Sequence, residues 1–137
     1  MSTEKIIEEG SDFKPKFDDN GLITAIAQDS SSGQVLMVAY MNKEALELTI
    51  QTGFATYYSR SRKELWKKGI QSGHVQKVQQ ILVDCDQDCL VLKVSVDMGQ
   101  CHVGYNSCFY RALDKKNPEK LEFIAQKTYD PKEAYKK

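Results

Sequence analysis

Four cysteines lie close together in this 137-residue sequence, at Cys85, Cys89, Cys101 and Cys108. In a reducing compartment such thiols commonly bind metals or do chemistry, whereas a single free cysteine is more often simply buried. Three thiolates around zinc would leave a position for water, as in a catalytic site, whereas a fourth would close the site. The spacing alone does not choose between these arrangements, and Cys89 is interpreted as a structural cysteine.

Three aspartates, Asp84, Asp86 and Asp88, alternate with other residues around the first of these thiols. They do not form an EF-hand loop, because Cys89 stands at the required glycine position and Ser95 at the required glutamate position. On a straight strand the outer two would lie about 13 Å apart, so they can share a cation only if the chain turns. Crowded carboxylates repel one another, which favours a hard cation such as Mg²⁺, and a metal-free hairpin tip is the alternative.

The sequence has two histidines, His74 and His102. Each could transfer protons near neutral pH, and His102 is the stronger candidate because it directly follows a cysteine. A purely structural role is the alternative for both.

Positive charge is concentrated in residues 60–73, which we expect to form a long loop. Arginine and lysine there could hold phosphate, although most lysines on such loops are simply solvated. Trp66 is either a core anchor or a stacking surface for a base. The basic residues of this segment are Arg60, Arg62, Lys63, Lys67 and Lys68.

The elements that must position these residues are mostly strands. Apolar runs at 22–28 and 34–40 flank a polar turn, and the second run is predicted to lie inside a sheet with both faces covered. A helix is predicted over 43–52, capped by Asn42 and Gly53, with an inward face of Ala45, Leu46 and Ile50. Further strands are expected at 54–59, at 75–83 and 90–96 as a hairpin, and at 108–113, with a short helix over 117–127.

Composition limits the classes of function. With 19 basic and 19 acidic residues, the chain lacks the positive bias of a nucleic-acid-binding surface. It also lacks the roughly 20-residue apolar run of a membrane span, and its first ten residues do not resemble a secretory signal. We therefore expect a cytoplasmic protein with no nucleic-acid or membrane partner. The expected organisation is a loosely ordered segment 1–20, a catalytic domain 21–113, and a charged segment 114–137 that holds the short helix and ends in a solvated tail.

Several motifs in register closely resemble the phosphoribosyl-AMP cyclohydrolase family of histidine biosynthesis. The resemblance covers about residues 22–113 and is far more specific than any single motif. The motifs are Met-Val-Ala-Tyr-Met-Asn at 37–42, Tyr-Ser-Arg-Ser-Arg at 58–62, Trp-Lys-Lys-Gly at 66–69 with Ser-Gly-His-Val-Gln at 72–76, Val-Asp-Cys-Asp-Gln-Asp at 83–88, Cys-His at 101–102 and Ser-Cys-Phe-Tyr-Arg at 107–111.

We expect an α+β, predominantly β fold, with twisted antiparallel sheets and one or two short helices, and the resemblance implies an intertwined homodimer. It also implies zinc bound across the subunit interface by Cys85, Cys101 and Cys108, and magnesium bound by Asp84, Asp86 and Asp88. This chain departs from the family pattern at Gln87, a turn position that is commonly glycine, and in having Cys89 as an additional thiol.

The activity that the resemblance implies is hydrolytic opening of the adenine ring of phosphoribosyl-AMP. Zinc-activated water would attack the amine-bearing ring carbon, and the ring bond would break to give the formimino-carboxamide ribonucleotide. His102, and after it His74, would move protons, because the His-x-Glu motif of zinc deaminases is absent. The expected substrate-binding residues are Arg60, Arg62, Trp66, Lys68 and Ser72.

Two other functions use the same residues. A zinc-dependent nucleotide deaminase would release ammonia instead of opening the ring. A non-catalytic, zinc-stabilised dimerisation or RNA-binding module would need a fourth protein ligand, for which Cys89 is the candidate.

Overall fold

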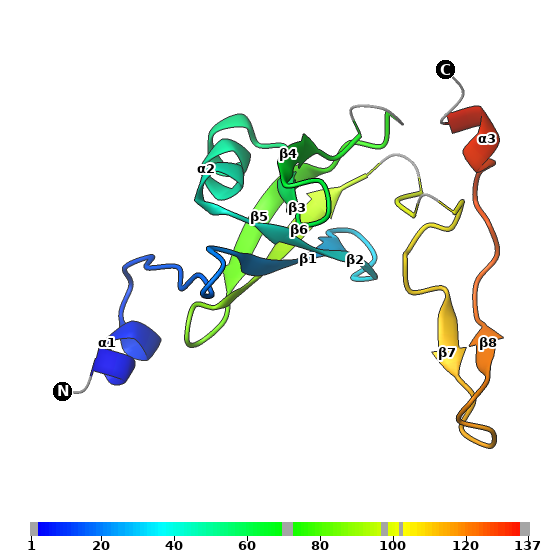
Figure 1. Cartoon of the computed structure of the whole chain (residues 1–137), viewed down its shortest axis with the longest axis horizontal. Coiled ribbons are helices and arrows are strands. Elements are labelled where there is room, and N and C mark those ends of the chain that lie inside the picture. The colour runs from blue at the N-terminus through cyan, green and yellow to red at the C-terminus, as the bar shows by residue number, and fades with distance from the viewer. Residues whose placement is uncertain (1–2, 70–72, 97–98, 102, 135–137) are drawn as a thin grey trace.

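The computed structural model describes residues 3–69, 73–96, 99–101 and 103–134, with the side chains of 3–5, 133 and 134 left aside. Its centre is a four-stranded sheet with the strand order β2-β1-β6-β5 (Figure 1). β1 pairs antiparallel with β2 and parallel with β6, and β5 and β6 form an antiparallel hairpin as predicted. The four strands are β1 (Ile23–Asp29), β2 (Val35–Met41), β5 (Lys77–Val83) and β6 (Cys89–Ser95).

The two central strands, β1 and β6, carry the core. Alternate side chains along each strand are buried, as expected where successive residues point to opposite faces. In the parallel register Ala25 lies beside Leu90 and Ala27 beside Leu92, so small side chains of β1 leave room for large ones of β6. The buried residues of these strands are Ile23, Ala25, Ala27, Leu90, Leu92 and Val94.

The prediction that the second apolar run lies inside the sheet is wrong. β2 is an edge strand, and Val35 and Val38 are 41% and 44% exposed. Leu36, Met37 and Met41 are buried in the core, and the consecutive residues Leu36 and Met37 can both be buried because the pairing with β1 is irregular at Leu36. The uniform apolar run therefore reflects one buried face and one exposed apolar face, which hydropathy alone cannot distinguish from two buried faces.

Helix α2 (Lys43–Thr52) confirms the prediction of its bounds and caps. The side chain of Asn42 accepts a hydrogen bond from the Ala45 amide at 2.8 Å, and Gly53 ends the helix with φ of 78°. The expected inward position of Ile50 is wrong, because this side chain is 55% exposed. Thr49 faces inward instead, and its hydroxyl bonds the Thr56 backbone at 3.1 and 3.0 Å, which sets the rotation of the helix.

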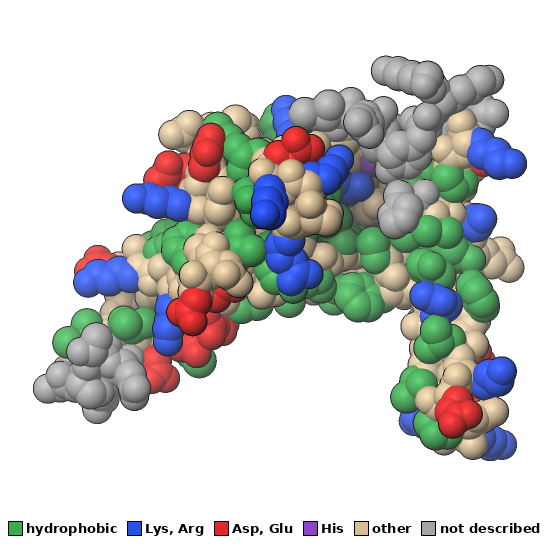
Figure 2. Space-filling view, in the orientation of Figure 1, with side chains coloured by type: hydrophobic (Ala, Val, Ile, Leu, Met, Phe, Trp, Pro, Cys, Tyr) green, Lys and Arg blue, Asp and Glu red, His purple; other side chains and the backbone are tan. Residues whose placement is uncertain are grey.

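The basic segment is not one long loop. Strands β3 (Thr56–Ser59) and β4 (Glu64–Lys67) form an antiparallel hairpin in which Tyr57 is opposite Trp66. Leu65 and Trp66 pack against the core while their charged neighbours face solvent. With only two apolar residues among charged ones, this short strand has no recognisable pattern in the sequence. Figure 2 shows basic side chains gathered over this hairpin.

The helix predicted over 117–127 is also absent from the described structure. This segment instead contains the hairpin of β7 (Arg111–Leu113) and β8 (Leu121–Phe123), and Asn117 accepts a turn hydrogen bond from the Lys120 amide at 2.9 Å. Cross-strand pairing in this hairpin outweighs the local helix-start signal of Asn-Pro. The hairpin stands apart from the main sheet, as the same view shows (Figure 1).

Helices α1 (Thr3–Glu9) and α3 (Pro131–Ala134) lie near the two ends of the chain. The observed architecture confirms a predominantly β protein with short helices, although the parallel β1–β6 pair was not predicted. Among the described residues, no helix is long and apolar enough to span a membrane.

Candidate active site

The acidic residues are brought together by the β5–β6 turn. Asp84 sits at its start, where one carboxylate oxygen accepts hydrogen bonds from the Asp88 and Cys89 amides, both at 3.0 Å. Asp84, Asp86 and Asp88 each offer a carboxylate oxygen within 4.8 Å of the others. The chain therefore makes the turn that a shared cation requires, and the exposed cluster of hard oxygen donors fits Mg²⁺.

The electrostatics of this turn reflect the crowding of the three carboxylates. Hydrogen bonds with Asp86 and Asp84 raise the pKa of Asp88 to about 6. The pKa of Asp84 is lowered: desolvation opposes the shift, but hydrogen bonds from its neighbours outweigh it. The raised pKa of Asp88 reflects the crowding of negative charge, which a bound divalent cation would relieve.

A second cluster is formed by Cys101 and Cys108, which lie in one tight loop. The Gln100 amide bonds the Asn106 carbonyl and the Cys101 amide bonds the Tyr105 carbonyl, both at 3.0 Å, and the Cys108 amide bonds β2 at 2.7 Å. The two thiols interact with each other. Burial raises the pKa of Cys108 to about 12, and the charge and hydrogen bond of the neighbouring Cys101 add to the shift. Paired soft sulfur donors of this kind fit zinc, which binds them as thiolates.

The third predicted zinc ligand, Cys85, does not join this pair within one chain. It is exposed on the β5–β6 turn, before β6 begins, whereas the other two follow the end of that strand. Seven strand residues span about 20 Å. Among the described residues of a single chain, the cysteines therefore form no three-ligand group. Cys89 is half-buried at the start of β6, away from the paired thiols.

Lys68 and His74 are buried beside the cysteine loop. The Lys68 ammonium donates to the Gln100 carbonyl at 3.0 Å, and burial lowers its pKa while Cys108 and Cys101 oppose that shift. Burial, and then the charge of Lys68, lower the pKa of His74, against a hydrogen bond with Gly99 that raises it. The imidazole is therefore neutral near pH 7 and able to accept a proton.

Gly69, which follows Lys68, lets its own backbone pass close to the backbone of His74 and Val75. Its φ is +95°, and a Cβ at this position would lie 2.4 Å from the Val75 amide nitrogen and 2.7 Å from the His74 carbonyl carbon. Only glycine fits so close to another backbone segment in this conformation.

A buried network of polar side chains connects this region to the core. The hydroxyl of Tyr57 donates to the Gln76 carboxamide oxygen at 2.5 Å, and the Gln76 amide donates to Gln100 at 3.0 Å and to the sulfur of Met37 at 3.2 Å. Burial raises the pKa of Tyr57, so that its hydroxyl remains a donor. The chain of contacts reaches Gln100, the residue before Cys101.

Tyr129 closes the site from the C-terminal segment. Its ring lies edge-on to His74 at 4.6 Å, its hydroxyl donates to the Cys101 carbonyl, and its amide bonds Gly104 at 3.3 Å. The expectation that the charged tail after residue 127 is solvated is therefore wrong at Tyr129. Sequence analysis missed this residue, as well as Tyr57 and Gln100, because each is brought to the site by contacts distant in sequence. Gln76 had a signal, since it ends one of the recognised motifs.

The remaining basic candidates lie on a different surface. Arg60 stacks over Tyr40 at 4.0 Å and borders an open hollow of about 560 Å³ between β2 and the β3–β4 hairpin. Arg62 is exposed and lies 3.8 Å from Glu64. Trp66 packs against Tyr57 with ring centres 5.2 Å apart, which favours the core-anchor interpretation. Lys68 is separate from this exposed group because it is buried.

Two predicted site residues, His102 and Ser72, lie outside the described residues.

Comparison with known proteins identifies the family. The family model for phosphoribosyl-AMP cyclohydrolase matches residues 37–110, which include the acidic turn and all four cysteines. The chain belongs to the phosphoribosyl-AMP cyclohydrolase family. It is 55% identical to the phosphoribosyl-AMP cyclohydrolase of Methanococcoides burtonii over 120 residues, which are 88% of this chain and 94% of the relative.

Two further relatives are similar along most of their length. The phosphoribosyl-AMP cyclohydrolase of Rhodopseudomonas palustris is 54% identical over 135 residues, 96% of this chain and 89% of the relative. That of Methanospirillum hungatei is 53% identical over 122 residues, 89% and 88% of the two chains. These findings confirm the family assigned from the sequence motifs and the prediction that the chain is an enzyme, a phosphoribosyl-AMP cyclohydrolase.

Proposed function

We propose that this chain hydrolyses phosphoribosyl-AMP in histidine biosynthesis, opening the adenine ring at a zinc site shared by two subunits. Membership in the cyclohydrolase family supports the reaction. The observation that carries the proposal is the incomplete thiol site: Cys101 and Cys108 are paired beside Lys68 and His74, and Cys85 lies exposed at the opposite end of β6.

A second copy of the chain would complete that site. Cys85 cannot reach its own Cys101 and Cys108 along a strand of about 20 Å, but in a symmetric dimer it can be supplied to the partner. The β7–β8 hairpin supports such a dimer because it stands apart and exposes large apolar side chains, which Figure 2 shows along its length. Its exposed residues include Leu113, Leu121 and Phe123, at 59%, 53% and 64%.

The three sulfur donors define what the metal would contribute. Zinc held by three thiolates keeps one position open and would supply water activated to react at neutral pH. Cys85 is exposed on the turn and accessible to a partner, whereas Cys89 is half-buried at the start of β6, which favours an open site with three thiolates over the closed, four-ligand site of a non-catalytic module. Magnesium would be held by Asp84, Asp86 and Asp88 on the turn that also carries Cys85.

The protein side chains would bind the substrate and move protons. His74 is neutral and buried near the paired thiols, so it can accept a proton, and we retain His102 as the other candidate for this role. Arg60 would bind phosphate at the open hollow beside Tyr40, and Arg62, two residues along and exposed, would add a second forked donor. Lys68, which is buried against the cysteine loop, would favour the thiolate forms of Cys101 and Cys108 instead.

Incubating the purified protein with phosphoribosyl-AMP tests the proposal. We expect the ring-opened ribonucleotide to form without release of ammonia, and we expect a zinc chelator to abolish turnover until zinc is restored. Stoichiometric ammonia would identify a deaminase instead. Full turnover in metal-free protein would refute the zinc site, and no turnover by zinc-loaded protein would favour the non-catalytic module.

A further inference from the structure

Gln87 has an unusual position for a turn residue. It lies between Asp86 and Asp88, which are exposed, yet its own side chain is only 6% exposed. Its φ is +60°, in the left-handed region that disfavours side chains other than Gly, Asn and Asp. A glutamine held in this conformation and buried at a hairpin tip must therefore be stabilised by specific contacts.

Those contacts are made to the N-terminal segment. The Gln87 side-chain oxygen accepts from the Lys14 amide at 2.7 Å, and its nitrogen donates to the carbonyls of Asp12 at 3.1 Å and Ile7 at 3.5 Å. The Gln87 carbonyl accepts from the Lys16 amide at 2.7 Å. A single residue of the metal-binding turn thus bonds to four backbone groups of residues 7–16, which we call the N-terminal strap.

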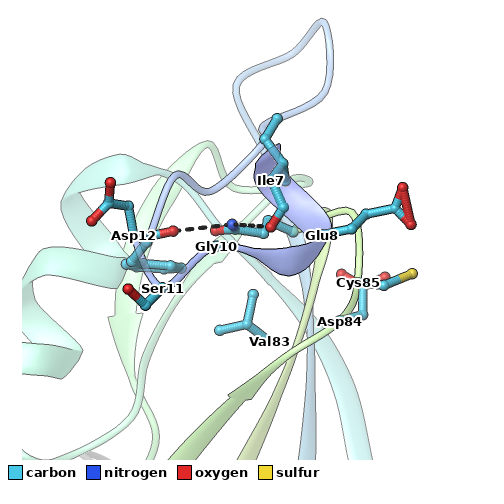
Figure 3. Close-up of a pocket in the computed structure, with 10 residues that line it drawn as sticks. Ile7, Glu8, Gly10, Ser11, Asp12, Val83, Asp84 and Cys85 are labelled. Carbon is cyan, nitrogen blue, oxygen red and sulfur yellow. Dashed lines mark hydrogen bonds between the residues drawn. The ribbon is translucent and has the colours of Figure 1, made fainter. Parts of the chain in front are cut away.

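The strap lies against the turn that carries the proposed ligands. Figure 3 shows Ile7, Gly10 and Asp12 on one side of a hollow and Val83 and Asp84 on the other. The hollow has a volume of about 280 Å³. Gln87 borders this hollow too, and the hydrogen bonds between the strap and the turn that join described residues are all made by Gln87.

We infer that Gln87 is a positioning residue, which clamps the N-terminal strap onto the β5–β6 turn and so holds the three carboxylates in their metal-binding arrangement. This inference rests on the magnesium site of the proposed function. The hydrogen bonds between the buried Gln87 side chain and the strap fix the backbone on both sides of Gln87. With the backbone fixed, the side chains of Asp86 and Asp88 are exposed and lie close to Asp84. Without the clamp, the turn would sample other conformations and only a fraction of molecules would be ready to bind.

Replacing Gln87→Asn separates the clamp from the turn conformation. Asparagine tolerates the left-handed region well, but it is one methylene too short to reach the strap. Lys14→Pro breaks the same contact from the other side, because proline has no amide N–H to donate. Gln79→Asn is a matched control, since Gln79 lies on β5 and its side chain bonds Ser95, at 2.8 Å, and no described residue of the strap.

The experiment combines calorimetric titration with MgCl₂ and limited trypsin digestion of each full-length variant. If the clamp keeps most turns ready to bind, losing it should raise the apparent Kd for Mg²⁺ at least about threefold, in both Gln87→Asn and Lys14→Pro. Cleavage after Lys16 should become at least about tenfold faster, because the strap would detach more often. The double variant should be no worse than either single variant, since both break one contact.

Other outcomes would overturn the inference. Faster cleavage with unchanged Mg²⁺ affinity would mean that Gln87 holds the strap but does not position the carboxylates. Unchanged cleavage would mean that the strap does not depend on Gln87, and an equal effect of Gln79→Asn would mean a general loss of stability. A wild-type protein that gives no heat with MgCl₂ would instead refute the magnesium site itself, and this inference with it.

Discussion

Removing one buried hydroxyl should measurably destabilise the protein, because Tyr57→Phe breaks the hydrogen bond at the start of the polar network. Tyr57 and Gln76 are fully buried, so no water can replace the lost donor on the Gln76 oxygen. An acceptor left in that state costs about 1–3 kcal/mol. For a chain of 137 residues, this corresponds to a melting temperature lower by about 3–10 °C.

The assay is thermal unfolding followed by circular dichroism at one fixed protein concentration, with zinc retention measured on the same samples. Tyr58→Phe is the matched control, because Tyr58 is half-buried and its hydroxyl bonds no described residue. We also expect weaker zinc retention in Tyr57→Phe, because Gln76 contacts Gln100 next to the cysteine loop. If Tyr57→Phe melts no lower than Tyr58→Phe, the network does not contribute as described.

Three further substitutions test other parts of the site. Gly69→Ala should lower the free energy of unfolding by more than about 2 kcal/mol, measured by urea denaturation, because the new Cβ would meet the backbone of His74 and Val75; a smaller loss would show that the close approach is not rigid. Lys68→Met should weaken zinc binding about tenfold in a chelator competition, as loss of a supporting contact does, whereas Arg60→Met should leave zinc affinity unchanged; equal effects would contradict the separation of the two basic groups. Phe123→Asp should shift the protein toward monomers in analytical ultracentrifugation, and an unchanged dimer would exclude the β7–β8 hairpin from the interface.

Much of the fold was predictable where the determining interactions are local. The cap residues Asn42 and Gly53 define α2 through contacts three or four residues away, and the aspartates at 84–88 form their turn within the same few residues. The edge position of β2 was not predictable, because an apolar run does not reveal how many strands flank it. The β7–β8 hairpin was missed because its pairing outweighs a strong helix-start signal at Asn117.

In the candidate site, too, some residues could be predicted from the sequence and others could not. Cysteine and aspartate are common metal ligands, so their clustering in the sequence was enough to predict them as candidate ligands. The residues that support them are ordinary polar side chains, and Tyr129 reaches His74 only after the chain has returned past the β7–β8 hairpin. That Cys85 lies apart from Cys101 and Cys108 in one chain follows from the length of β6, which is a structural fact that spacing in the sequence does not give.

The central claim, a zinc site built from two chains, is tested most directly by combining two inactive variants in one dimer. Cys85→Ser and Cys101→Ser, each with a different affinity tag, are expressed together, and the mixed dimer is isolated by both tags. Each parent should lack zinc and turnover. In the mixed dimer one of the two symmetric sites receives all three native thiols, so we predict roughly half of the wild-type activity and zinc content. A mixed dimer as inactive and zinc-free as its parents would contradict the shared site.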